Sequence, residues 1–178
     1  MSLKPAPGDD KHASSALSAT RTESGETYIF YFDSKNKICY LKGSGTGSYA
    51  EYSVSMKNDG VSTAAVGDTR TLTSTLFDQE QASLPLVCEQ VHVYYVQNDY
   101  IKAAWWHVHD GEWRTGLINA KGYKVTRGTG ISSLGQQELH GKPGQHRLEV
   151  YFNDQDNEDK FSVAYFKDKE WHKAVVEV

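Results

Sequence analysis

The sequence predicts an all-β protein built from three propeller-like repeats. Its 178 residues include 11 Tyr, 6 Phe, 4 Trp and 15 Gly. Aromatic side chains favour the half-buried surface of a sheet, and glycine favours the turns between strands. An aromatic strand motif recurs three times, which indicates a repeat architecture. The best helical candidate, 72–84, is broken by charges and followed by Pro85, so the fold class stays all-β.

The chain divides into a short tail and one domain. Residues 1–12 contain two prolines, a glycine and two adjacent aspartates without apolar periodicity, which predicts a disordered tail. From residue 13 onward, short alternating runs are separated by turn residues, so we expect 13–178 to form a single domain.

An aromatic strand marks each repeat. The strands centre on the pairs Tyr31-Phe32, Tyr94-Tyr95 and Tyr151-Phe152. A polar turn and a second strand follow each pair. Two copies then reach a tryptophan, Trp113 or Trp171, and the stretch after it is expected to be the fourth strand of the repeat. Short strands of small residues are expected between these hairpins, at 14–19, 60–65 and 130–134.

The repeat is long enough for a propeller blade of about four strands. Approximate limits of the three repeats are 13–65, 66–134 and 135–178. Small residues suit the crowded axis of a propeller, whereas aromatic residues fill the space between blades. A β-sandwich or a barrel is the alternative. The early strand at 14–19 suggests a blade completed by strands from both chain ends or from a neighbouring chain.

The repeat motif resembles the fungal fucose-specific lectin family. The closest match runs from 91–97 to 106–113, and weaker matches cover 28–41 and 148–171. The resemblance implies a six-bladed propeller with sugar sites between blades, of which three repeats form half. It therefore implies that two chains assemble as a homodimer that completes a ring, because closure removes exposed strand edges.

The family's polar site residues are replaced in this sequence. The resemblance places an arginine before each aromatic strand and a glutamate two positions after the isoleucine of the next strand. The arginine positions hold Ile29, His92 and Glu149, and the glutamate positions hold Tyr40, Ala103 and Val163. The aromatic component remains at Trp113 and Trp171. We therefore expect a non-catalytic, carbohydrate-binding lectin that does not bind fucose in the family's manner.

A tryptophan-rich segment, 105–114, combines aromatic rings with polar groups. Sugars stack their apolar face on such rings, while their hydroxyl groups need donors and acceptors nearby. Trp105 and Trp106 should face opposite sides of their strand. The alternative is that these rings only pack between sheets, which suits a propeller-like protein-interaction module without sugar binding. The candidate carbohydrate-binding residues are His92, Trp105, Trp106, Trp113, Arg114, Glu149 and Trp171.

Metal binding and catalysis have weaker signals. His107 and His109 would share one side of a strand, with Glu112 as a third ligand, which leaves a metal-dependent β-barrel enzyme as another alternative. The acidic loop 153–159 lacks the pattern of a calcium loop and is expected to be a solvated turn. No nucleophile or phosphate-loop motif is found. We expect no enzyme activity and no cofactor.

Charge and hydropathy limit the partners. The formal net charge is −4, with 19 basic and 23 acidic residues interspersed, so nothing favours nucleic acid as a partner. The sequence has no apolar run of the roughly 18 residues that a membrane span needs and no secretory signal, which predicts a cytoplasmic protein. The expected partners are glycans or glycoproteins.

Overall fold

A computed structural model describes residues 16–22, 24–33, 35–55, 71–80, 87–107, 111–136, 147–157 and 160–176. Apart from two short 3-10 turns, η1 (Leu117–Ala120) and η2 (Gln155–Asn157), its regular elements are strands. The all-β prediction is confirmed. No helix in these ranges is long and apolar enough to cross a membrane. The predicted tail, 1–12, lies outside the described residues.

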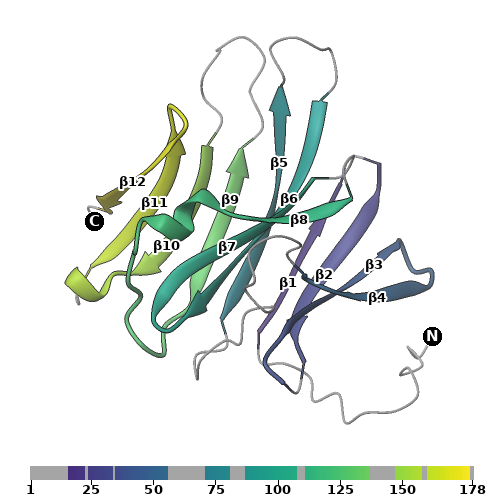
Figure 1. Ribbon diagram of the computed structural model, residues 1–178, viewed down its shortest axis with the longest axis horizontal. Coiled ribbons are helices and arrows are strands. Elements are labelled where there is room, and N and C mark those ends of the chain that lie inside the picture. Colours follow the sequence, from purple (N-terminus) through teal and green to yellow (C-terminus); the bar gives the residue numbers. More distant parts are fainter. Residues whose placement is uncertain are drawn as a thin grey trace.

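The strands form three antiparallel sheets of four strands, each taken in chain order (Figure 1). The first sheet contains β1 (Leu17–Arg21), β2 (Glu26–Phe32), β3 (Ile38–Ser44) and β4 (Tyr49–Ser53). The second contains β5 (Leu72–Glu80), β6 (Val87–Gln97), β7 (Tyr100–His107) and β8 (Glu112–Thr115). The third contains β9 (Ile131–Gln136), β10 (Arg147–Asn153), β11 (Phe161–Lys167) and β12 (Glu170–Val175).

The sheets are arranged like propeller blades. The second sheet lies between the other two, with β4 and β12 at opposite ends of the fan (Figure 1). The first strands meet near the centre, where Ser74 of β5 donates its backbone N–H to Ser18 Oγ of β1 at 2.8 Å. On the other side of β5, the backbone N–H of Ser133 on β9 donates to Thr73 Oγ1 at 3.2 Å.

Three details of the predicted repeat need correction. β1 pairs with β2 in a complete sheet, so no blade is shared between the chain ends; the tight turn from Thr22 to Glu26 joins the two strands directly. The second sheet begins with β5, which covers most of the weak helical candidate, whereas the predicted strand 60–65 lies outside the described residues. Trp113 and Trp171 lie within fourth strands rather than before them.

Two apolar cores hold the sheets together. The first lies between the first and second sheets and includes Phe30, Tyr40, Val93, Tyr95 and Trp113. The second lies between the second and third sheets and includes Tyr94, Ile101, Val150, Phe152 and Trp171. Successive residues of a strand face opposite sides, so Val93 and Tyr94 contribute to different cores. The second sheet is therefore covered on both faces.

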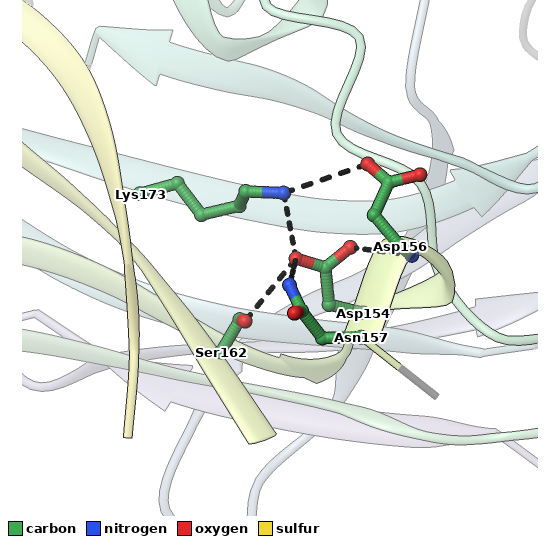
Figure 2. Close-up of polar contacts among 5 residues, drawn as sticks. All are labelled: Asp154, Asp156, Asn157, Ser162 and Lys173. Atoms are coloured by element: carbon green, nitrogen blue, oxygen red, sulfur yellow. Dashed lines mark hydrogen bonds and ion pairs between the residues drawn. The ribbon is translucent and has the colours of Figure 1, made fainter. Parts of the chain in front are cut away.

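A buried carboxylate braces the hairpin of β10 and β11 against β12 (Figure 2). Asp154 is 0% exposed and accepts hydrogen bonds from Lys173 Nζ at 2.6 Å and Ser162 Oγ at 3.2 Å. It also accepts hydrogen bonds from Asn157 Nδ2 at 3.4 Å and the Asp156 backbone N–H at 3.1 Å. The sequence predicts a solvated turn for the acidic loop, and at Asp154 this prediction is wrong because the side chain is buried. Its hydrogen-bond donors compensate for the removal of the carboxylate from water.

Candidate functional site

Strand register identifies the equivalent positions of the three sheets. The central hairpins pair Phe32 with Ile38, Val96 with Ile101, and Asn153 with Phe161. The position four residues before the first member of each pair is occupied by Tyr28, His92 and Glu149, in the order of the sheets. Tyr28 belongs to the core shared with the second sheet. His92 lies two residues before Tyr94 and so on the same face of β6, and Tyr94 belongs to the core shared with the third sheet.

One sequence assignment is therefore wrong by a residue. Ile29 faces away from the second sheet, and Tyr28 stands at the position that corresponds to His92. The cause is the turn length: five residues separate Phe32 from Ile38, whereas four separate Val96 from Ile101. An alignment that superimposes the aromatic pairs of the three repeats therefore places every residue of β2 one position out of register. Because neighbouring strand residues face opposite sides, that error assigns each β2 side chain to the wrong face.

Aromatic rings fill the space between the first and second sheets. Tyr28 is 0% exposed and Trp113 4% exposed, and the Trp113 ring contacts Tyr40 at 5.5 Å and Phe30 at 5.9 Å between centroids. Burial raises the pKa of Tyr28, and its hydroxyl donates to Glu26 at 3.3 Å. These contacts leave Trp113 little surface on which a sugar could stack.

A second group of side chains lies where the beginning of β6, the end of β7 and β8 pair, on the face of the second sheet that is turned toward the third sheet. Register pairs place six side chains on this one face. We call this group the outer corner of the second sheet. Its members are Gln90, His92, Trp105, His107, Glu112 and Arg114.

Trp105 is the centre of the outer corner. The Arg114 guanidinium lies over its ring, with Cζ 5.2 Å from the centroid. The His92 ring stacks with it at 6.1 Å and 14°, and His107 presents an edge at 6.1 Å and 75°. Trp105 is half-buried and Arg114 is exposed. The corner thus combines a half-buried aromatic ring with an exposed planar donor group.

His92 supports this arrangement as a neutral residue. It is buried, and burial lowers its pKa to about 3. Its Nε2 lies 3.0 Å from Gln90 Oε1. Because an amide oxygen only accepts, Nε2 carries the proton and donates to Gln90. His92 therefore packs on Trp105 as an uncharged ring. The positive charge on this face of the corner belongs to Arg114 of β8.

The structure separates the other predicted site residues. Trp106 faces the first core, where its ring lies 5.6 Å from that of Trp113, so the predicted opposition of Trp105 and Trp106 is confirmed. Trp171 is 5% exposed and contacts Tyr94 at 6.0 Å in the second core. Glu149 lies on the outer face of the third sheet and accepts a hydrogen bond from Tyr151 Oη at 2.7 Å. The packing alternative thus describes Trp106, Trp113 and Trp171.

Sequence reasoning missed Gln90 in the outer corner. The signal was its position two residues before His92, which places both side chains on the same face of β6. For the metal hypothesis, the described part of the chain contains no group of three or more His, Cys, Asp and Glu residues that could hold a metal ion. His107 is paired in register with Glu112, while His109 lies outside the described residues.

The three-sheet fold is similar to that of fungal lectins of known structure. The chain matches AofleA from Arthrobotrys oligospora with a TM-score of 0.66 and 17% identity, over 94% of this chain and 43% of that one. It matches the fucose-specific lectin of Aleuria aurantia with a TM-score of 0.64 and 16% identity, over 92% and 49% of the two chains. Another structure of the Aleuria aurantia lectin, described as a six-bladed β-propeller, gives 0.62 and 14%.

These likenesses show the fold. The propeller-like architecture predicted from the repeats is confirmed, and the chain spans just under half the length of the lectins it matches. No protein-family model matches the sequence, and no curated protein matches it either. A function for this chain therefore has to be proposed from its own side chains.

Proposed function

We propose that the protein is a lectin that binds saccharides without catalysis, with the outer corner of the second sheet as its binding site. The observation that carries this proposal is the half-buried Trp105 ring, held between the His92 imidazole and the Arg114 guanidinium. A fold shared with fucose-binding lectins supports the same function class.

The chemistry of the corner suits a sugar ring. The Arg114 guanidinium covers one face of the Trp105 ring and is exposed, so it can turn off the ring to donate hydrogen bonds to sugar hydroxyl oxygens. The uncovered indole face then stacks on the apolar C–H face of the sugar. Glu112, on the same face, supplies carboxylate oxygens that accept hydrogen bonds from hydroxyl groups. Ala103 stands where the resemblance places a glutamate, and neutral His92 where it places an arginine. These replacements favour a sugar preference other than fucose.

The test compares two aromatic side chains, the half-buried Trp105 and the exposed Tyr52. Trp105→Ala removes the stacking surface and should weaken binding to the best ligand of a glycan array by about tenfold or more, since such contacts contribute about 1–2 kcal/mol. Tyr52→Ala is the matched control, because Tyr52 is 46% exposed on the first sheet and lies outside the corner.

Two results would contradict the proposal. Equal loss of binding in both variants would indicate general destabilisation, and unchanged binding in Trp105→Ala would remove the corner from the site. Thermal unfolding of both variants distinguishes a local effect from a global one.

The second candidate function is a protein-interaction module. The burial of Trp113 and Trp171 in the two cores favours it, because those rings pack rather than offer sugar platforms. A free sugar that competes for binding to an immobilised glycoprotein would support the lectin. Binding to the deglycosylated protein with equal affinity would support the module instead.

We also propose that two copies of the chain complete a ring. Three sheets correspond to half of a six-bladed propeller, and two copies would carry duplicate sites that increase avidity for multivalent glycans. A protein that sediments as a monomer would contradict this assembly.

A cytoplasmic location stays a prediction that fractionation of cells expressing the protein can test.

A further inference from the structure

The two internal seams between sheets repeat the same three contacts at equivalent positions. The first contact joins the inner strands. Ser18 accepts a hydrogen bond from the backbone N–H of Ser74 at 2.8 Å, and Thr73 accepts one from that of Ser133 at 3.2 Å. The acceptors Ser18 and Thr73 lie opposite Phe30 and Tyr94, which are themselves equivalent positions.

The second contact joins a ring on a second strand to a tryptophan on the fourth strand of the next sheet. Phe30 meets Trp113 at 5.9 Å and 82°, and Tyr94 meets Trp171 at 6.0 Å and 77°. Both pairs have the edge-to-face geometry that aromatic rings favour.

The third contact is apolar burial on both sides of the seam. Ile38 is the first residue of β3 and Ile101 the second residue of β7, and they are 2% and 0% exposed. On the opposite side of the first seam lies Leu72, the first residue of β5 in the second sheet, which is 6% exposed. A seam thus has two different halves, one on each of the sheets that meet there.

The outer face of the third sheet carries the first half of another seam. Ser132 lies opposite Tyr151, as Ser18 lies opposite Phe30, and Ser132 is exposed. Tyr151 stands at the position of the seam ring and is only half-buried. Phe161 corresponds to Ile38 and Ile101 but is 58% exposed. No sheet of the described residues covers this face.

The outer face of the first sheet carries the second half. Leu17 lies opposite Tyr31, as Leu72 lies opposite Tyr95, yet Leu17 is 69% exposed. Ala19 stands at the position of Ser74, whose backbone N–H is the donor of the inner contact. In the fourth strand, Tyr49 corresponds to Trp113. The complementary halves lie at opposite ends of the fan of sheets (Figure 1).

We propose that these two faces bind a second copy of the chain through a third seam with the same contacts. Ser132 Oγ accepts a hydrogen bond from the backbone N–H of Ala19 of the partner subunit. Tyr151 meets Tyr49 of the partner subunit edge to face, and Phe161 and the partner's Leu17 become buried. This inference rests on the proposed two-copy ring and specifies the residues that close it.

A second copy satisfies this surface better than an unrelated partner. Each copy carries both halves, so a twofold axis forms two identical seams at once and leaves neither face exposed. The contacts it would make already occur twice within the chain, with the same geometry. The surface is therefore continuous with an interface that the fold itself demonstrates.

Cysteine cross-linking tests the register of the seam. In a chain with Cys39→Ser and Cys88→Ser, we would introduce Ala19→Cys and Ser132→Cys and oxidise the purified protein. The positive control is Thr73→Cys with Ser133→Cys, because the two hydroxyl oxygens lie 3.0 Å apart within one chain and cysteine sulfurs there can bridge with little movement. Ser132→Cys alone is the negative control.

The expected product is a covalent dimer on a non-reducing gel, with loss of both free thiols, while the positive control forms its disulfide within a single chain. A ladder of larger species would overturn the closed two-copy ring. A dimer in sedimentation that forms no disulfide would overturn these contacts but leave two-copy assembly standing, and a monomer would overturn both. The experiment contains no saccharide, so its result is independent of glycan binding.

Discussion

At the scale of single residues, the direction in which a side chain points decides its role. Trp105 and Trp106 are adjacent, yet Trp105 reaches the outer corner and Trp106 the first core. The sequence predicts this opposition, because strand residues alternate sides. It does not reveal that Trp113 and Trp171 are buried, since burial depends on which sheet packs against each face.

Asp154 allows a prediction about stability at the same scale. Burial alone would raise its pKa, but hydrogen bonds from Lys173, the Asp156 backbone and Asn157 outweigh burial and hold the pKa below the usual 3.8. A lowered pKa in the folded state stabilises the protein above the unfolded pKa, and that stabilisation is lost as the pH falls through the folded value. The wild type should therefore lose stability as the pH falls below about 4.

Asp154→Asn should remove this dependence. At pH 7 the variant should lose about 2–3 kcal/mol of unfolding free energy, because Lys173 then lacks its buried partner. Urea unfolding at several pH values measures both effects. Asp156→Asn is the matched control, since Asp156 is 66% exposed and lies 3.7 Å from the same ammonium group. An equal loss in both variants would contradict the role assigned to Asp154.

At the scale of elements, the sequence predicts strands better than their partners. The three aromatic hairpins follow from alternation and turn residues, and all three are present. The register of the first sheet is missed because a single extra turn residue shifts one face to the other. The outer corner is predicted in part, since His92, Trp105 and Arg114 meet only when β6, β7 and β8 pair.

Gly135 shows how closely the second and third sheets approach each other. A Cβ atom placed there would overlap the carbonyl oxygen of Leu76 and lie 2.6 Å from Thr75 Oγ1. Gly135→Ala should therefore force β5 and β9 apart and reduce the unfolding free energy by about 2 kcal/mol or more. Chemical denaturation measures the loss.

Gly130→Ala is the matched control for this substitution. A Cβ at Gly130 meets nothing within 4 Å, and its backbone is outside the left-handed region. The control should be neutral or slightly stabilising, because alanine restricts the unfolded chain. Comparable destabilisation by both alanines would show that the close contact at Gly135 is not what limits the approach of the sheets.

At the scale of the whole molecule, the three sheets present a repeated interface whose two halves remain exposed. Leu17 at one end and Phe161 at the other are large apolar side chains at positions that are buried in the internal seams. Burying such residues is favourable by roughly 1.5–3 kcal/mol each, so two new seams per ring supply a substantial driving force for association. The same association would place duplicate outer corners on one particle.

Leu17→Glu separates assembly from binding at each site. A charge buried in a seam should prevent ring closure, and sedimentation should show the change from dimer to monomer. Affinity for a monovalent saccharide should stay unchanged, because Leu17 lies on the first sheet, away from Trp105 and Arg114. Binding to a dense glycan surface should fall by about 10²-fold or more as avidity is lost. Equal weakening of monovalent and surface binding would instead show that the substitution damages the site itself, and an unchanged surface affinity in a confirmed monomer would contradict any role of the ring in avidity.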